Sequence, residues 1–172
     1  MAGIRYIMVQ SPEPCNPKST AYQNGYATIA EIGKERIRRA GEMIKRENPQ
    51  IGEALDIGFR VLKLGSAHLD DDGNIIPDRL DEDLLFWVMN TLGLDLSSCV
   101  QKQSVDGQIV YVVGKDELVA CFGMITRKIT NSIVRRKPKF ACYFGAGLTE
   151  EAGKHMREAF GRRSPDTVIK VI

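Results

Sequence analysis

The order of hydrophobic and polar positions predicts a strand, a long helix and a second strand in the first 64 residues. The apolar run Ile4-Arg-Tyr-Ile-Met-Val-Gln10 is typical of a buried strand of an α/β sheet. Further along, Thr28 and Glu31 have the spacing of a helix cap, and Pro49 ends the amphipathic run that they begin. The apolar residues of this run recur at near-helical spacing, at Ile29, Ile32, Ile37, Ala40 and Ile44. Residues 58–64 alternate apolar and basic side chains, which indicates a strand with one buried face.

The remainder of the chain predicts a helix, a hairpin and a short parallel sheet. Residues 81–93 begin with acidic side chains and end in glycine, as a helix does. Residues 99–105 and 108–113 flank Asp106-Gly107, a two-residue loop that hairpin geometry prefers. Three apolar runs then alternate with two helical segments, a pattern that predicts parallel strands joined by right-handed crossovers. The strands are expected at 118–122, 139–144 and 167–172, and the helices at 127–137 and 149–161.

A polar segment at residues 65–80 is predicted to be a linker between two lobes. We place the boundary near residue 75, which gives domains 1–75 and 76–172. The linker contains Asp70-Asp-Asp-Gly-Asn74, which matches about half of the ligand pattern of a calcium-binding loop. The register would put His68 at the first ligand position and Arg79 at the closing one, so we predict a turn.

Composition is that of an ordinary folded domain, with 172 residues, 43% hydrophobic residues and a net charge of +2. This mild charge does not by itself indicate nucleic-acid binding. Four widely spaced cysteines suggest neither a zinc site nor a disulfide framework, and Cys121 and Cys142 fall in strand-like runs as expected buried thiols. No apolar stretch is long enough to span a bilayer and no leader is visible, so we expect a cytoplasmic protein without a membrane partner.

Two clusters could bind a ligand or a polyanion. Gly145-Ala-Gly147 follows an expected strand and could let a nucleotide or S-adenosylmethionine approach the backbone. Glu150 stands where a dinucleotide fingerprint needs a small residue, which favours a tight turn. Arg135-Arg-Lys-Pro-Lys139 could contact phosphates, yet cations in the last turn of a helix followed by proline also fit a helix end.

The exposed face of the helix at 28–48 carries Lys34, Arg38 and Arg39, our candidate nucleic-acid contacts, although a solvated face is the simpler interpretation. With only two histidines in the chain and no recognisable nucleophile motif, a histidine-assisted nucleophilic site has no support. We therefore expect no catalytic residues and no metal ligands in this chain.

Several blocks of the sequence resemble, in order, the modification subunit of type III restriction-modification systems. The most specific are Arg5-Tyr-Ile-Met-Val-Gln-Ser-Pro-Glu-Pro14 and Thr28-Ile-Ala-Glu-Ile-Gly-Lys-Glu-Arg-Ile-Arg-Arg39. Later blocks are Gly58 to Leu64, Glu82 to Leu85, Gly93 to Leu96, Leu118 to Phe122, Lys137-Pro138 and Ser164 to Thr167 with Lys170-Val171. The resemblance covers nearly the whole chain.

This resemblance implies an adenine-specific DNA methyltransferase that uses S-adenosylmethionine and flips its target base out of the duplex. It also implies duplex DNA, a homodimer of modification subunits and a restriction subunit with helicase and nuclease functions as partners. The family's Asp-Pro-Pro-Tyr motif is missing, because no two prolines here are adjacent, and its glycine-rich cofactor loop would lie ahead of residue 4. We therefore expect a C-terminal fragment that is inactive alone.

The fold expected from the resemblance is α/β, with a partial methyltransferase-like, Rossmann-like β-α-β unit followed by a small α/β lobe. In such a unit the end of the first strand meets the cofactor ribose, which makes Gln10 and Glu13 the candidate cofactor-binding residues. Gln10 ends the strand and Glu13 offers a carboxylate, and both alternatives stay open. The competing hypothesis is a non-catalytic α/β module for assembly or DNA binding.

Overall fold

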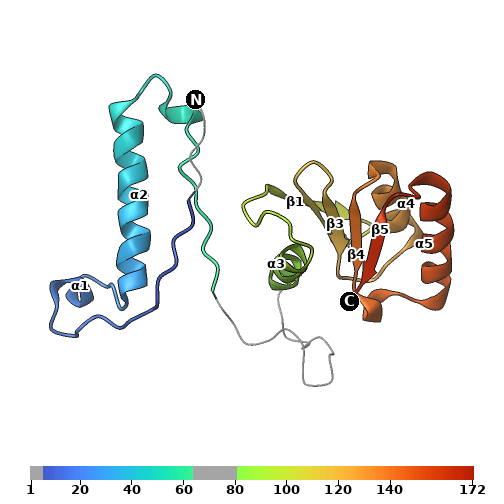
Figure 1. Cartoon of the computed structure of the whole chain (residues 1–172), viewed down its shortest axis with the longest axis horizontal. Helices are drawn as coiled ribbons and strands as arrows, with labels where there is room; N and C mark the ends of the chain where they lie inside the picture. Colours follow the sequence, from blue (N-terminus) through green and yellow to red (C-terminus); the bar gives the residue numbers. More distant parts are fainter. Residues whose placement is uncertain (1–5, 64–80) are drawn as a thin grey trace. The chain divides into compact units, whose positions relative to one another are not determined.

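The computed structural model describes residues 6–63 and 81–172, and contacts within the chain divide it into two compact units. Unit 1 is Met1–Val61 and unit 2 is Leu62–Ile172. The predicted linker, its turn at 70–74 and the boundary near residue 75 lie outside the described residues. Figure 1 shows the helices and strands of each unit.

Unit 1 is built around the long helix that the sequence predicts. This helix, α2, spans Ile29–Glu47, and the Thr28 hydroxyl oxygen accepts a hydrogen bond from the Glu31 backbone N–H at 3.3 Å. A one-turn helix, α1 (Thr20–Gln23), comes before it and a short 3₁₀ helix, η1 (Gly52–Ala54), follows. The predicted helix and its cap are confirmed, because both depend on neighbouring residues alone.

The two strands predicted beside this helix are wrong over the residues described. Residues 6–10 and 58–63 belong to no strand, and both segments follow an open path in Figure 1. Ile7 and Val9 are each 93% exposed. The single β-bridge among residues 6–63 joins Pro14 to Thr28. An apolar pattern forms a strand only against a partner strand, and neither segment pairs with one here.

Unit 2 contains a five-stranded mixed sheet with the strand order β1-β2-β3-β4-β5. The strands are β1 (Val100–Val105), β2 (Gln108–Val113), β3 (Leu118–Cys121), β4 (Phe140–Tyr143) and β5 (Val168–Val171). The first three strands are antiparallel neighbours, and β3, β4 and β5 run parallel. The expected hairpin and parallel sheet are therefore confirmed and joined in one sheet. Asp106 and Gly107 form the hairpin turn with positive φ angles of 52° and 78°, as such turns require.

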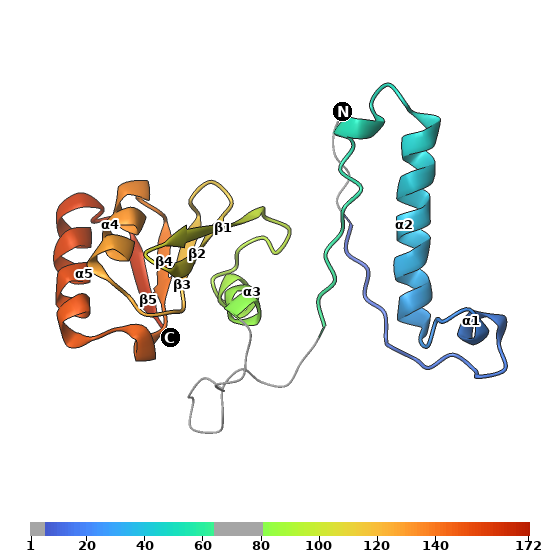
Figure 2. The ribbon, with the colours of Figure 1, turned by 180° about the vertical axis from the view of Figure 1, so that it is seen from behind.

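Helices cover both faces of this sheet. Helix α3 (Asp81–Thr91) packs on one face, and α4 (Arg127–Arg136) and α5 (Glu150–Arg163) pack on the other, as Figures 1 and 2 show. Alternate strand residues supply the two cores, so that Cys121 and Tyr143 face α4 and α5 while Ala120 and Cys142 face α3. Unit 2 is thus a three-layer α/β structure with its own core. The three helices predicted for this part of the chain are confirmed.

Candidate nucleic-acid interface

The candidate cofactor residues Gln10 and Glu13 lie on the open chain of unit 1, outside any strand. Both side chains are exposed, and the Gln10 amide nitrogen donates to the carbonyl oxygen of the next residue, Ser11, at 3.0 Å. The Glu13 backbone carbonyl accepts from the Ile29 N–H at 3.0 Å, which holds this segment against the start of α2. The structure therefore anchors the residue 13 backbone but does not place the two side chains at the end of a strand.

The candidate DNA contacts on α2 already interact with side chains of unit 1. Lys34 pairs with Glu31, and Arg39 donates to Glu35 at 2.8 Å. The Arg38 guanidinium lies 5.6 Å from the centre of the Phe59 ring and 3.7 Å from Glu35. Glu35 and Tyr26 raise the pKa of Arg39, because both favour the charged guanidinium. These pairings offset much of the positive charge that the sequence displays on this face.

The glycine pair after β4 forms the tight turn that the sequence favours. Gly145 to Gly147 make a short 3₁₀ turn, η2. The Gly145 N–H donates to the Ile172 carbonyl at 2.7 Å, and the Gly147 carbonyl accepts from the Ile125 N–H at 2.9 Å. A Cβ at residue 147 would lie 2.3 Å from the Gly123 carbonyl oxygen. Glycine is needed at residue 147 for the crossing of two backbones, and the N–H groups of Gly145 and Gly147 already donate to the carbonyls of Ile172 and Phe144.

Over residues 81–172, the topology of unit 2 gives no ligand crevice at the carboxyl ends of its parallel strands. Such crevices form where the strand order reverses and successive crossover helices lie on opposite faces. Here β3, β4 and β5 follow one another, and α4 and α5 pack together on one face.

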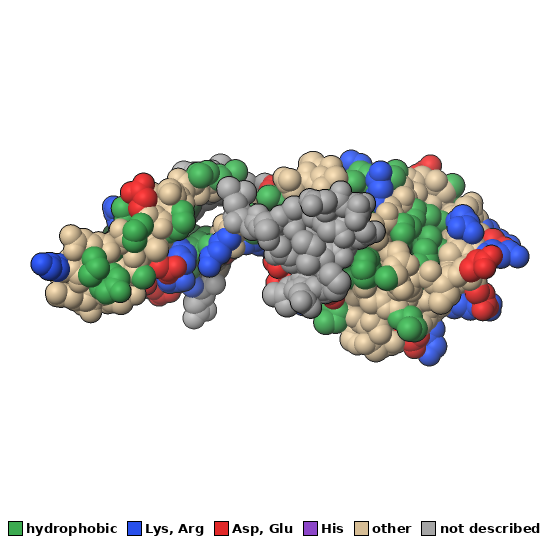
Figure 3. Space-filling view, turned by 90° about the horizontal axis from the view of Figure 1, so that it is seen from below, with side chains coloured by type: hydrophobic (Ala, Val, Ile, Leu, Met, Phe, Trp, Pro, Cys, Tyr) green, Lys and Arg blue, Asp and Glu red, His purple; other side chains and the backbone are tan. Residues whose placement is uncertain are grey.

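The charges of unit 2 are strongly segregated along the chain. Residues 127–163, which contain α4 and α5, carry ten Lys and Arg and only three carboxylates. Residues 81–126, which contain α3 and the hairpin, carry two cations and seven carboxylates. In Figure 3 several Lys and Arg side chains appear at the α4–α5 end of unit 2, with acidic side chains among them. The near-neutral net charge of the whole chain therefore conceals a basic layer.

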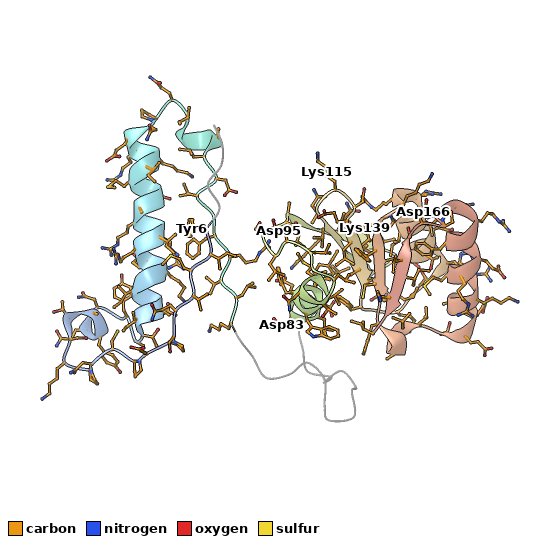
Figure 4. The ribbon with its side chains drawn as sticks, in the orientation of Figure 1. Tyr6, Asp83, Asp95, Lys115, Lys139 and Asp166 are labelled. Atoms are coloured by element: carbon orange, nitrogen blue, oxygen red, sulfur yellow. The ribbon has the colours of Figure 1, made fainter. Side chains whose placement is uncertain are left out.

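A hollow of about 460 Å³ opens where β3, β4 and β5 begin, and we call it the amino-edge hollow. Figure 4 shows Lys115, Lys139 and Asp166 around this edge of the sheet. Its charged lining residues are Lys115, Lys137, Lys139, Arg163, Asp116, Glu117 and Asp166, and the rest of the lining is Pro138, Ser164, Pro165 and Thr167.

Hydrogen bonds fix the floor of the amino-edge hollow. The Thr167 hydroxyl donates to the Pro138 carbonyl oxygen at 2.6 Å. The Ser164 and Thr167 hydroxyl oxygens lie 2.7 Å apart, and since the Thr167 proton is used, Ser164 is the donor between them. Ser164 is buried, with 5% of its surface exposed. These bonds join two segments that lie far apart in the sequence.

The charge balance of the amino-edge hollow is weakly positive. Its four cations face three carboxylates, but Asp116 already accepts from Arg136 at 3.0 Å. The C-termini of α4 and α5 each contribute roughly −0.5 of an elementary charge at this edge. The net charge of the hollow is then about +1, which suits weak contacts with phosphate groups and not tight binding of a single anion.

The buried thiols of unit 2 are poor nucleophiles. Desolvation raises the pKa of Cys142 to about 12 and also raises the pKa of Cys121. Since only the thiolate attacks, neither cysteine is suited to covalent catalysis. Both are buried without a disulfide, as the sequence predicts.

Sequence reasoning does not identify the amino-edge hollow, although its parts are visible in the sequence. The run from Arg135 to Lys139 is interpreted as a helix end, and the structure confirms this, with Lys137 capping α4 in the left-handed conformation. The run from Ser164 to Thr167 carries no chemical signal of its own. Only the hydrogen bond from Thr167 to Pro138 brings these two segments to one surface.

No family model and no curated protein matches this chain. Among the residues that the structure describes, no helix has both the length and the apolar character needed to cross a bilayer.

Proposed function

We propose that this chain is the C-terminal part of a type III modification subunit, an adenine-specific DNA methyltransferase. Unit 2 serves in it as a non-catalytic module that contacts duplex DNA through the amino-edge hollow. In the intact enzyme the partners are a second modification subunit and the restriction subunit, and the methyl donor is S-adenosylmethionine.

The hydrogen bond from Thr167 to Pro138 carries this proposal. It links two blocks that resemble the family, Lys137-Pro138 and Ser164 to Thr167, at a surface lined by four cations. Blocks that resemble one family and meet at one charged surface support a shared role in binding. A weakly positive surface of this kind suits the sequence-independent part of DNA recognition, in which cations contact backbone phosphates.

The apolar segments of unit 1 give separate support. Tyr6, Ile7, Met8 and Val9 are between 58% and 93% exposed, and Val61 is about half exposed. Exposed apolar segments flanking an amphipathic helix are what a strand-helix-strand piece presents without the rest of its sheet. Because these apolar segments are exposed, we include in the proposal that unit 1 is part of a methyltransferase-like sheet.

The cofactor does not fit the described residues by themselves. Gln10 and Glu13 can accept hydrogen bonds from ribose hydroxyls, but the Gln10 amide is bound to its neighbouring carbonyl and both side chains are exposed. We therefore assign no reaction step to this chain. Titration with S-adenosylmethionine is expected to give no saturable binding, and binding at micromolar concentration would contradict this assignment.

The experiment that tests DNA contact compares variants of the whole chain on a short duplex by gel shift. Lys137→Ala with Lys139→Ala removes two cations from the hollow, and Lys102→Ala with Lys128→Ala, two cations that do not line it, is the matched control for loss of charge. The first double variant is expected to bind more weakly and the control to bind like the original chain. Equal losses in both would remove the hollow from the proposal.

A second function, assembly without DNA contact, is favoured by the exposed apolar side chains of unit 1 alone. It predicts concentration-dependent association of the chain and no gel shift at any salt concentration. Analytical ultracentrifugation beside the gel shift separates the two functions.

A further inference from the structure

A second, smaller hollow lies between α4 and α5 and shares Arg163 with the amino-edge hollow. Its volume is about 110 Å³, and its lining is Asn131, His155, Glu158, Ala159, Arg162 and Arg163. The lining residues of α5 recur at intervals of three, four and seven positions, so they share the helix face that is turned toward α4. We call this hollow the interhelix hollow.

His155 supplies an unusual group to the interhelix hollow. Its ring nitrogen Nε2 is buried and has no hydrogen-bond partner among the described residues. A buried polar atom left without a partner costs about 1–3 kcal/mol. Since His155 also lines the interhelix hollow, a small rotation of its ring would bring this atom to a ligand bound there.

The neighbouring side chains decide the charge of that ligand. Arg162 and Arg163 bring two guanidinium groups, and neither has an ion-pair partner in the described part of the chain. The Asn131 amide on α4 adds a further donor, and Glu158 is the one carboxylate in the described lining. Two cations and an amide donor against one carboxylate select an anion, and guanidinium forks suit a phosphate in particular.

We propose that the interhelix hollow binds a phosphate group, with His155, Arg162 and Asn131 as its contacts. The phosphate comes either from the backbone of a nucleic acid or from a free phosphate. Both sources present the same oxygens, and the hollow has room for only a few atoms of their size. The proposal does not depend on the methyltransferase assignment, because it rests on the lining of this hollow alone.

The first experiment titrates the whole chain with inorganic phosphate and follows histidine side-chain nitrogens by NMR at constant pH, with sodium chloride at matched ionic strength as the control. The chain has two histidines, so His68 is an internal reference. Phosphate is expected to shift the His155 Nε2 signal saturably while His68 stays in place. No shift of His155, or an equal shift with chloride, overturns the proposal.

Variants then test the contacts. Arg162→Ala is expected to weaken phosphate binding about tenfold, the loss that corresponds to one charge-assisted hydrogen bond. His155→Leu is expected to abolish binding and His155→Gln, which keeps a donor, to retain part of it. Lys154→Ala removes a cation from α5 that does not line the hollow and is expected to bind as the original does. Unchanged binding in Arg162→Ala and His155→Leu, with thermal melts confirming folded protein, overturns the proposal.

Duplex DNA identifies the source of the phosphate. If His155→Leu and Arg162→Ala also weaken binding to a short duplex, the hollow takes a backbone phosphate. If DNA affinity is unchanged while inorganic phosphate binding is abolished, the hollow takes a free phosphate. This comparison leaves Lys137 and Lys139 intact, so failure at the interhelix hollow is distinguishable from failure at the amino-edge hollow.

Discussion

Substituting alanine for Gly147 is predicted to destabilise unit 2, because two backbones cross at this residue. The added Cβ would lie 2.3 Å from the Gly123 carbonyl oxygen and 3.0 Å from its carbonyl carbon. Both are backbone atoms, so relief requires movement of one segment away from the other. That movement breaks the bond from the Ile125 N–H to the Gly147 carbonyl and leaves the donor of a buried residue without a partner.

The magnitude follows from the breaking of that hydrogen bond. A buried donor left unpaired costs about 1–3 kcal/mol, and backbone strain adds to it, which gives a total of about 2–4 kcal/mol. This is a large part of the roughly 5–15 kcal/mol that typically stabilises a domain. Gly161→Ala is the matched control, because Gly161 lies inside α5 with no atom near its Cβ position. There the same substitution is expected to stabilise the chain by about 0.5–1 kcal/mol.

Urea unfolding followed by tryptophan fluorescence measures both variants. The chain has a single tryptophan, Trp87 in α3, so the signal reports on unit 2. The predicted result is a lower midpoint for Gly147→Ala and a higher one for Gly161→Ala. A Gly147→Ala chain as stable as the original would refute the packing argument and reopen the turn as a ligand loop.

Two further predictions concern polar groups of unit 2. The Thr126 hydroxyl and the Lys128 ammonium donate to Asp106 and lower the pKa of its carboxyl. The charged carboxylate therefore stabilises the folded chain above the ordinary pKa of 3.8, and this stabilisation is lost as the pH falls through the lowered pKa of the folded state. Urea unfolding midpoints of the original chain and of Asp106→Asn, measured across pH 2–6, should differ less as the pH falls. A difference that stays constant with pH would contradict this prediction. The hydroxyls of Tyr143 and Thr130 are buried without a partner among the described residues, so Tyr143→Phe and Thr130→Val are each expected to equal the original or to gain about 1 kcal/mol. A decrease above about 1 kcal/mol in thermal or urea unfolding would indicate a hidden hydrogen-bond partner.

Features that depend on neighbouring residues could be predicted from the sequence. The cap of α2 needs only Thr28 and the N–H of Glu31. The hairpin needs only two residues, Asp106 and Gly107, that accept positive φ. The parallel strands of unit 2 could be predicted because their apolar runs are long enough to form strands and pair with one another in one sheet.

Features that depend on distant partners could not be predicted. Residues 6–10 have the composition of a strand, but a strand also needs a neighbour that exchanges hydrogen bonds with it. The amino-edge hollow depends on Thr167 reaching Pro138, and no local pattern encodes that interaction. Gly147 could be assigned to a turn, but only the structure shows that the Gly123 backbone crosses it.

The salt dependence of DNA binding tests the central claim most directly. Fluorescence anisotropy of a labelled duplex gives the affinity of the whole chain between about 50 and 200 mM salt. The account predicts that log affinity falls linearly with log salt. It also predicts that Lys137→Ala with Lys139→Ala reduces the slope by about 1.8, which is about 0.9 for each phosphate that is no longer neutralised. Affinity that does not change with salt, or a slope that the double variant leaves unaltered, would contradict the account.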